Sequence, residues 1–160
     1  MLEDYIRERR QQRDILLMTH IVLGYPSLEA SIEVVDVMDR AGVDLIELQI
    51  PFSEPMADGP VILHANQKAL AAGATVDQCL KAAGDLSARV SAPLLFMSYY
   101  NILFRRGVAR FTAQMKAAGM KGAIVPDLPH EEGQDYLDAM QAEGLDPIFL
   151  YSPNTSDARM

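Results

Sequence analysis

Two carboxylates near the middle of the chain have surroundings that suit chemistry. Residues 43–60 read V-D-L-I-E-L-Q-I-P-F-S-E-P-M-A-D-G-P, so Glu47 interrupts an apolar stretch and Asp58 lies in the proline-rich loop that follows. Burying a carboxylate without partners is costly and raises its pKa, and a carboxyl group with a raised pKa can exchange protons with a substrate. Glu47 is therefore a candidate functional group, with a buried ion pair to Lys or Arg as the alternative. Asp58, within A-D-G-P, also fits an ordinary turn.

Strand periodicity divides the segment around Glu47 into two faces, because successive side chains of a strand point to opposite sides. One face holds Asp44, Ile46, Leu48 and Ile50, and the other holds Leu45, Glu47 and Gln49. The first face is suited to a hydrophobic core. The second carries the functional groups.

The amino-acid composition excludes several classes of protein. The 160 residues are 49% hydrophobic, which is enough for a single domain over residues 1–160 with a substantial core. The net charge of -8 argues against a nucleic-acid surface, which needs clustered Lys and Arg. Cys79 is the only cysteine, so no internal disulfide forms. No signal-like or membrane-spanning apolar run occurs, and we expect a soluble protein of the reducing cytoplasm.

Apolar runs typical of strands alternate with helical patterns, which predicts a parallel sheet built from βαβ units. Strands are expected at residues 16–23, 44–50, 94–100, 123–128 and 148–151. Helices are expected from Ser27 to Gly42, from Thr75 through Val90, after Gly107, from about residue 131 to Gly144, and over residues 2–13.

Five such strands fit either a compact doubly wound sheet or the first five strands of an eight-stranded barrel. The chain has neither G-x-G-x-x-G nor G-x-x-x-x-G-K-[ST], so nucleotide-binding doubly wound sheets lose support. Polar residues at the carboxyl ends of the predicted strands favour the barrel, because barrel enzymes place their chemistry there. These residues are Glu47, Tyr99, Asn101 and Asp127.

Four motifs in order along the chain resemble the tryptophan synthase alpha subunit family. The long segment E-L-Q-I-P-F-S-E-P-M-A-D-G-P is similar to the family signature, and G-Y-P-S, Y-Y-N and P-D-L-P are shorter matches. The resemblance covers essentially the whole chain. It implies an α/β fold of the TIM barrel family, of which this chain covers about the first five strands, as a partial barrel with an N-terminal helix.

The resemblance also implies an activity, the retro-aldol cleavage of indole-3-glycerol phosphate to indole and glyceraldehyde 3-phosphate in tryptophan biosynthesis. In that chemistry Glu47 matches the acid/base position, and Asp58 matches the group that accepts the indole N–H. No metal or organic cofactor is expected in this chain. Pyridoxal phosphate is expected only in a beta subunit, the partner in an alpha2beta2 heterotetramer.

Further positions match the substrate pocket and the partner interface of the family. The expected pocket residues are His20, Met97, Tyr99, Ile124, Pro126 and Leu150. Each fits ordinary barrel packing equally well, and His20, where the family has an aromatic residue, is either a ring-stacking substitute or a core histidine. The expected interface residues are Phe52, Ser53, Glu54, Pro55 and Asn101.

The chain departs from the family pattern in several places. Gln49 stands where the family usually has Gly, so either the pocket is narrower or Gln49 orients the catalytic carboxylate. Glu54 replaces the usual Asp, and Thr19 the usual Pro. Such barrels run to about 250 residues, and the family's phosphate-binding parts come from strands six to eight. We therefore expect this 160-residue chain to be a fragment with weak or no lyase activity alone.

Other functions remain to be separated from the lyase. One is a non-catalytic barrel subunit that binds and regulates a partner enzyme, and retention of both carboxylates argues against it. Another is a related phosphosugar barrel enzyme with a different substrate. A self-contained doubly wound domain is the third, and neither of the last two explains the spacing of Glu47 and Asp58 within the motif.

Overall fold

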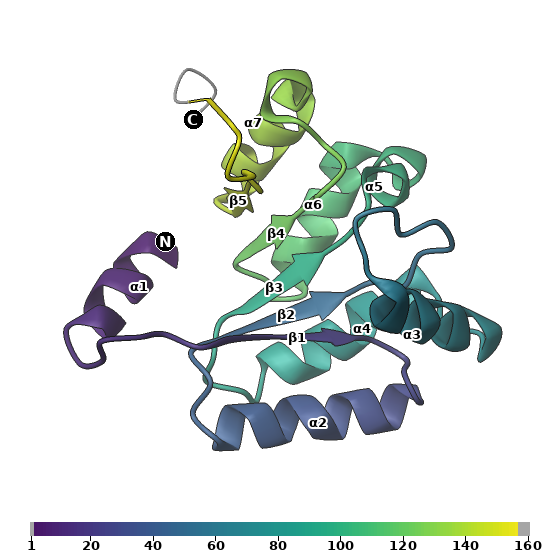
Figure 1. The fold of residues 1–160 in the computed structure, drawn as a ribbon, viewed down its shortest axis with the longest axis horizontal. Coiled ribbons are helices and arrows are strands. Elements are labelled where there is room, and N and C mark those ends of the chain that lie inside the picture. The colour runs from purple at the N-terminus through teal and green to yellow at the C-terminus, as the bar shows by residue number, and fades with distance from the viewer. Residues whose placement is uncertain (1, 157–160) are drawn as a thin grey trace.

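The computed structural model describes residues 2–156, and its centre is a five-stranded parallel sheet with the order β1-β2-β3-β4-β5 (Figure 1). The strands are β1 (Met18–Val22), β2 (Leu45–Gln49), β3 (Leu94–Met97), β4 (Gly122–Ile124) and β5 (Asp146–Ile148). The helices are α1 (Leu2–Arg10), α2 (Leu28–Arg40), α3 (Pro60–Ala71), α4 (Val76–Ser87), α5 (Tyr100–Arg106), α6 (Val108–Ala117) and α7 (Gln134–Glu143), with a short 3₁₀ turn η1 (His130–Glu132).

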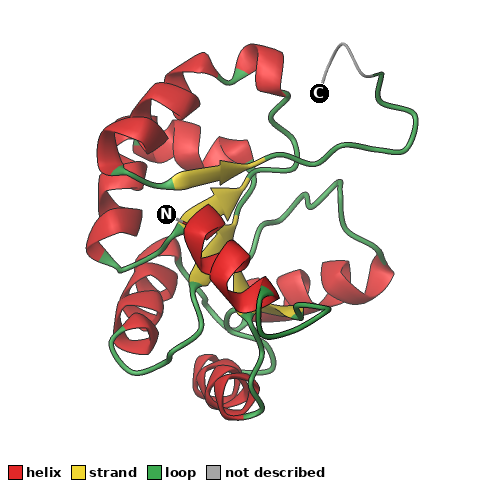
Figure 2. Ribbon diagram, turned by 90° about the vertical axis from the view of Figure 1, so that its left-hand side faces the viewer, coloured by secondary structure: helices red, strands yellow, loops and turns green. Residues whose placement is uncertain are grey.

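The strand order follows the chain without reversal. A doubly wound sheet reverses its order at a switch point, whereas a barrel adds each strand beside the previous one. The sequential order therefore excludes the doubly wound alternative. Figure 2 shows helices following the sheet around one side, while α1 crosses the opposite side.

The main hydrophobic core lies between the sheet and helices α2, α4, α6 and α7. We call this side of the sheet its outer face and the opposite side its inner face. Ile46, Leu48 and Ile50 of the β2 segment are fully buried there with Phe96 of β3. Helices contribute the other half of this core through Val35, Leu86, Phe111, Met115 and Met140. The period-two assignment of the apolar face of β2 is thus confirmed.

Helix α1 covers the amino-terminal part of the inner face. Leu2 packs with Leu45 and Leu95 of the sheet, and its backbone N–H donates to Asp146 Oδ2 at 2.7 Å. Hydrophobic contact and a charge-assisted hydrogen bond therefore hold this helix against β2, β3 and β5 together.

Asp44, just before β2, ties the segment after α1 to the sheet. Its carboxylate is buried and accepts from the Leu17 N–H at 2.9 Å, from Arg9 at 2.7 Å and from Arg13 at 3.1 Å. The Leu17 hydrogen bond and the two guanidinium groups hold the pKa of Asp44 below its ordinary value, although burial acts in the opposite direction.

Two helix starts agree with their sequence signals. Ser27 caps α2 by accepting from the Ala30 N–H at 3.1 Å. Thr75 and Gln78 form the expected capping box at the start of α4. Each side chain satisfies a backbone donor that has no partner inside its helix.

Several predicted boundaries are wrong. The third and fourth strands end earlier than predicted, at Met97 and Ile124, so Tyr99 is the residue before α5 and Pro126 lies in a loop. The fifth strand is residues 146–148 and not 148–151. Pro147 is tolerated within it because the N–H that bonds to β4 belongs to Asp146, which donates to the Lys121 carbonyl oxygen at 3.0 Å, so this ladder needs no N–H at residue 147.

Close approach of β4 and β5 requires a glycine. A Cβ at Gly122 would overlap the carbonyl oxygen of Asp146 on the neighbouring strand. Helix α5 has no counterpart in the predicted elements, and the sequence patterns give no bounds for α3. Within residues 2–156, no helix has the length and apolar character needed to cross a membrane.

Replacing Leu48 with alanine should lower the free energy of unfolding by about 2–5 kcal/mol. Leu48 is fully buried in the outer-face core, so the change leaves a cavity. The same change at Leu17, which is 55% exposed, should cost about 0.5 kcal/mol or less. Urea unfolding followed by circular dichroism measures both values, and equal losses would contradict the packing described for β2.

Candidate active site

Strand register brings the polar residues of β1 and β2 together. His20 pairs with Glu47, and two residues further along the same strands Val22 pairs with Gln49. Residues in register on parallel strands point to the same side of the sheet. His20, Glu47 and Gln49 therefore share the inner face, opposite the hydrophobic core.

Glu47 lies in the middle of this inner face with its side chain only 13% exposed. Its Oε1 is 3.9 Å from Nε2 of His20, beyond hydrogen-bond length. Burial raises the pKa of Glu47, a neighbouring positive charge on His20 would lower it, and the charge of Asp58 raises it further. The carboxyl group is thus placed where its neutral form is favoured.

Asp58 is held over the same face by two amide side chains. Gln49 Nε2 donates to Asp58 Oδ2 at 2.7 Å, and Asn66 Nδ2 lies 3.4 Å from the same oxygen. Asn66, fully buried in α3, also accepts from the Phe52 N–H at 2.9 Å. The loop that carries Asp58 is therefore attached to α3 at both of its ends.

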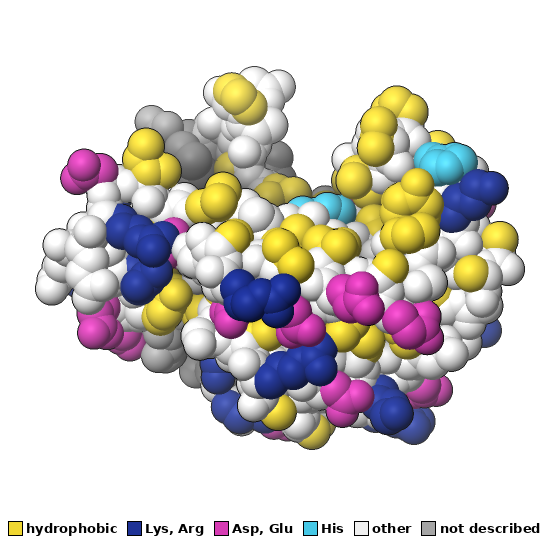
Figure 3. Space-filling view, turned by 90° about the horizontal axis from the view of Figure 1, so that it is seen from below, with side chains coloured by type: hydrophobic (Ala, Val, Ile, Leu, Met, Phe, Trp, Pro, Cys, Tyr) yellow, Lys and Arg dark blue, Asp and Glu magenta, His cyan; other side chains and the backbone are white. Residues whose placement is uncertain are grey.

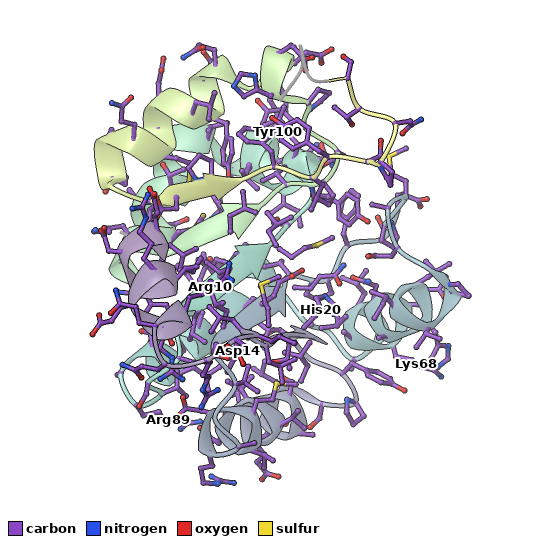
Figure 4. All side chains as sticks on the ribbon, turned by 60° about the vertical axis from the view of Figure 1, so that its left-hand side comes forward. Arg10, Asp14, His20, Lys68, Arg89 and Tyr100 are labelled. Carbon is purple, nitrogen blue, oxygen red and sulfur yellow. The ribbon has the colours of Figure 1, made fainter. Side chains whose placement is uncertain are left out.

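The other end of the Gln49 amide contacts β1. Its Oε1 lies 2.8 Å from Nε2 of His20, so one side chain connects His20, β2 and Asp58. His20, labelled in Figure 4, lies between α1, marked by Arg10, and α3, marked by Lys68. Within the described residues Gln49 hydrogen-bonds to Asp58 and not to Glu47, the carboxylate with which it shares a strand face.

His20 also lines an apolar groove between β1 and α3. It has a volume of about 480 Å³, and Tyr25, Val61 and His64 are among its lining residues. Figure 3, which views the molecule from the side of α2, shows hydrophobic side chains gathered beside histidine at one end of this face. His20 therefore borders this groove and the polar inner face.

Three of the predicted pocket residues form one apolar cluster on the inner face. Met97, Tyr99 and Ile124 are buried together and pack against Phe52 and Ile148. The rings of Phe52 and Tyr99 stack with centroids 5.1 Å apart. This cluster adjoins the residues that hold Asp58, because the Phe52 N–H donates to Asn66 Oδ1.

Tyr99 also positions the loop that carries Asp58. Its hydroxyl oxygen accepts from the Ala57 N–H at 3.0 Å, immediately before Asp58. Burial raises the pKa of Tyr99 to about 12, so the group remains a neutral hydroxyl. A residue expected to contact substrate thus anchors the loop backbone as well.

The remaining predicted residues lie elsewhere. Pro126 and Leu150 line a separate cavity of about 400 Å³ with His130 and Phe149, and Leu150 is 64% exposed. Of the expected interface residues, Ser53, Glu54 and Asn101 are exposed, Phe52 is half-buried and Pro55 is buried.

Asn66 is a residue of the candidate site that the sequence patterns do not indicate. It lies in α3, whose buried side consists of Asn66 with Ala65 and Ala69. Small and polar residues give no clear hydrophobic period, so neither the helix nor its role is visible in the pattern. Within residues 2–156, no group of three or more His, Cys, Asp or Glu side chains is arranged to hold a metal ion.

A family model and individual relatives both match this chain, and they name the same family. The family model described as "Tryptophan synthase alpha chain" matches residues 6–160. The chain is 62% identical over 160 residues to the tryptophan synthase alpha chain of Syntrophotalea carbinolica, and 61% identical over 160 residues to that of Desulforapulum autotrophicum. Each alignment covers 100% of this chain and 63% of the relative, so the chain spans less than two thirds of their length.

Solved structures agree with the fold. The tryptophan synthase subunit alpha from Legionella pneumophila matches with a TM-score of 0.93 and 34% identity, over 98% of this chain and 60% of that one. A chain of the tryptophan synthase complex from Pyrococcus furiosus matches with a TM-score of 0.86 and 33% identity, over 90% and 59%. The five strands are therefore part of a TIM barrel, and the predicted partial barrel is confirmed.

Changing Glu47 to glutamine should alter the pH dependence of stability. Because the folded state raises the pKa of Glu47, its ionisation is less favourable in the folded than in the unfolded chain. The stability it provides is complete below the ordinary glutamate pKa and is lost as pH rises through the raised value. The Glu47→Gln chain should therefore gain stability relative to the unchanged chain as pH rises.

Thermal unfolding between about pH 4 and pH 8 measures this difference. Glu33→Gln on the exposed side of α2 is the matched control, since the same chemical change is made outside the site. Parallel curves for Glu47→Gln and the unchanged chain would contradict the raised pKa.

Proposed function

The chain belongs to the tryptophan synthase alpha chain family, and on that premise we propose that the complete protein cleaves indole-3-glycerol phosphate to indole and glyceraldehyde 3-phosphate. The observation that carries the proposal is the position of Glu47. It is a nearly buried carboxyl with a raised pKa, on the inner face beside the anchored carboxylate Asp58.

Glu47 supplies both proton transfers of the cleavage. In its neutral form the carboxyl gives its proton to C3 of the indole ring. The resulting carboxylate then takes the proton of the side-chain hydroxyl, the carbon–carbon bond breaks, and its electron pair restores the aromatic ring. The aldehyde product leaves and Glu47 is again protonated. A raised pKa favours the neutral starting form.

Asp58 stabilises the positive charge that develops on the indole ring. Protonation of C3 places this charge on the ring nitrogen, and a fixed carboxylate that accepts the N–H lowers its energy. Gln49 and Asn66 hold Asp58 in place at 2.7 and 3.4 Å. The support for this role is that Asp58 is positioned before any substrate binds.

The apolar part of the site receives the indole ring. Met97, Tyr99 and Ile124 provide buried apolar surface beside the two carboxylates, as a ring of this kind requires. His20 borders the same inner face. Contacts of Pro126 and Leu150 with the substrate stay predictions, because these residues line the neighbouring cavity.

The proposed partner is a tryptophan synthase beta subunit, which holds pyridoxal phosphate and consumes the indole in the cytoplasm. The exposed residues Ser53, Glu54 and Asn101 would face it, with Phe52 and Pro55 supporting the loop from within. The similarity to a chain of the tryptophan synthase complex from Pyrococcus furiosus supports a partner of this class. An alpha2beta2 stoichiometry stays a prediction.

The test is the change Glu47→Gln in the complete protein. Because glutamine can neither give nor take the proton, the rate of indole formation should fall by about 10²–10⁴-fold while stimulation of the beta subunit persists. The assay is indole release from indole-3-glycerol phosphate.

Glu33→Gln, on the exposed side of α2, is the control and should leave that rate unchanged. If the complete protein without any substitution stimulates the beta subunit but releases no indole, the lyase proposal fails. The protein is then a non-catalytic barrel subunit.

A further inference from the structure

Gln49 is buried with both ends of its amide occupied. Its exposure is 0%, its Oε1 lies 2.8 Å from His20 Nε2, and its Nε2 donates to Asp58 Oδ2 at 2.7 Å. A buried amide with unsatisfied ends would be costly. The two contacts remove this cost and join β1, β2 and the loop before α3.

The direction of the amide follows from the chemistry of its partners. As a carboxylate, Asp58 can only accept a hydrogen bond, so the NH₂ end of Gln49 must face it. The carbonyl end then faces His20, whose Nε2 must carry the proton. In a neutral His20 ring, Nδ1 is therefore the bare nitrogen.

The same contact keeps the His20 N–H away from Glu47. Nε2 of His20 is 2.8 Å from the Gln49 oxygen but 3.9 Å from Glu47 Oε1. Within residues 2–156 no hydrogen bond to the Glu47 carboxyl is formed. If the Gln49 oxygen were removed, the ring could turn the same N–H toward Glu47.

We propose that Gln49 is a positioning residue that links His20 to Asp58, fixing the Asp58 carboxylate over the inner face and directing the His20 N–H away from Glu47. The roles of Glu47 and Asp58 in this inference rest on the proposed function, but the link itself does not. A glycine at this position would provide no side chain for such a link.

Gln49 bonds to the two residues whose charges act on the pKa of Glu47. His20 approaches from β1 and Asp58 from the loop before α3, and both act on the pKa of Glu47. Tyr99, after β3, affects Asp58 through the loop backbone at Ala57. Within the described residues Gln49 is the one side chain that hydrogen-bonds to both His20 and Asp58.

Nitrogen NMR of the histidine rings tests the link without any activity measurement. The chain has three histidines, and His64 and His130 are exposed, so they serve as internal references. At about pH 8, where an ordinary histidine is neutral, His20 should show a protonated Nε2 and a bare Nδ1. In Gln49→Met, which has similar length but no hydrogen bonds, the two nitrogen signals should move toward each other as both tautomers become populated.

A double-mutant cycle distinguishes the link from a merely structural role. Asp58→Asn removes the charge that orients the amide, so it should change the His20 tautomer although the two residues are on different elements. In a Gln49→Met background the same Asp58 change should have no further effect. Gln67→Met, on the exposed side of α3, is the control and should leave the His20 signals unchanged.

An unchanged tautomer in Gln49→Met, or an Asp58 effect that persists without Gln49, would overturn the inference. In the complete protein, Gln49→Met should lower kcat by about 10–100-fold and move the alkaline limb of its pH profile to lower pH. The shift follows because a freed His20 N–H stabilises the Glu47 carboxylate. A complete protein with no lyase activity would defeat the proposed function while the NMR result still decides the link.

Discussion

The parallel pairing of β1 with β2 is the constraint on which the site depends. Partners in register point to the same side, so the His20–Glu47 pair must share one face of the sheet. The opposite face is filled by Ile46 and Leu48 beneath the helices. A slip of one residue would place Glu47 in that hydrophobic core, where its burial would have no compensation. The register that builds the core therefore also builds the site.

The loop after β2 depends on contacts from three other parts of the fold. Asn66 of α3 holds its beginning at Phe52, Tyr99 after β3 holds it at Ala57, and Gln49 of β2 holds Asp58. Between these anchors Ser53 and Glu54 remain exposed. One loop can thus present a fixed carboxylate inward and an exposed surface outward. This arrangement suits a site whose product is proposed to pass to a partner subunit.

Prediction from sequence succeeded where the signal is local. The apolar face of β2, the Ser27 cap and the Thr75–Gln78 capping box each follow from residues a few positions apart. Prediction gave no bounds for α3, because its buried side is made of small and polar residues and has no hydrophobic period. It also failed at the strand ends, where the ladder stops at Met97 and continues through Pro147.

By itself, the sequence determined that Glu47 and Gln49 share one face of a strand, that the strands alternate with helices, and that the Glu47–Asp58 motif belongs to one family. Only the tertiary structure decided which of these groups meet. Gln49 joins His20 to Asp58, and Asn66 supports the loop, through contacts 29, 9 and 14 residues apart in the chain. Periodicity reports the direction of a side chain from its own strand or helix. Its partner depends on strand register and on the path of a loop, which are properties of the folded chain.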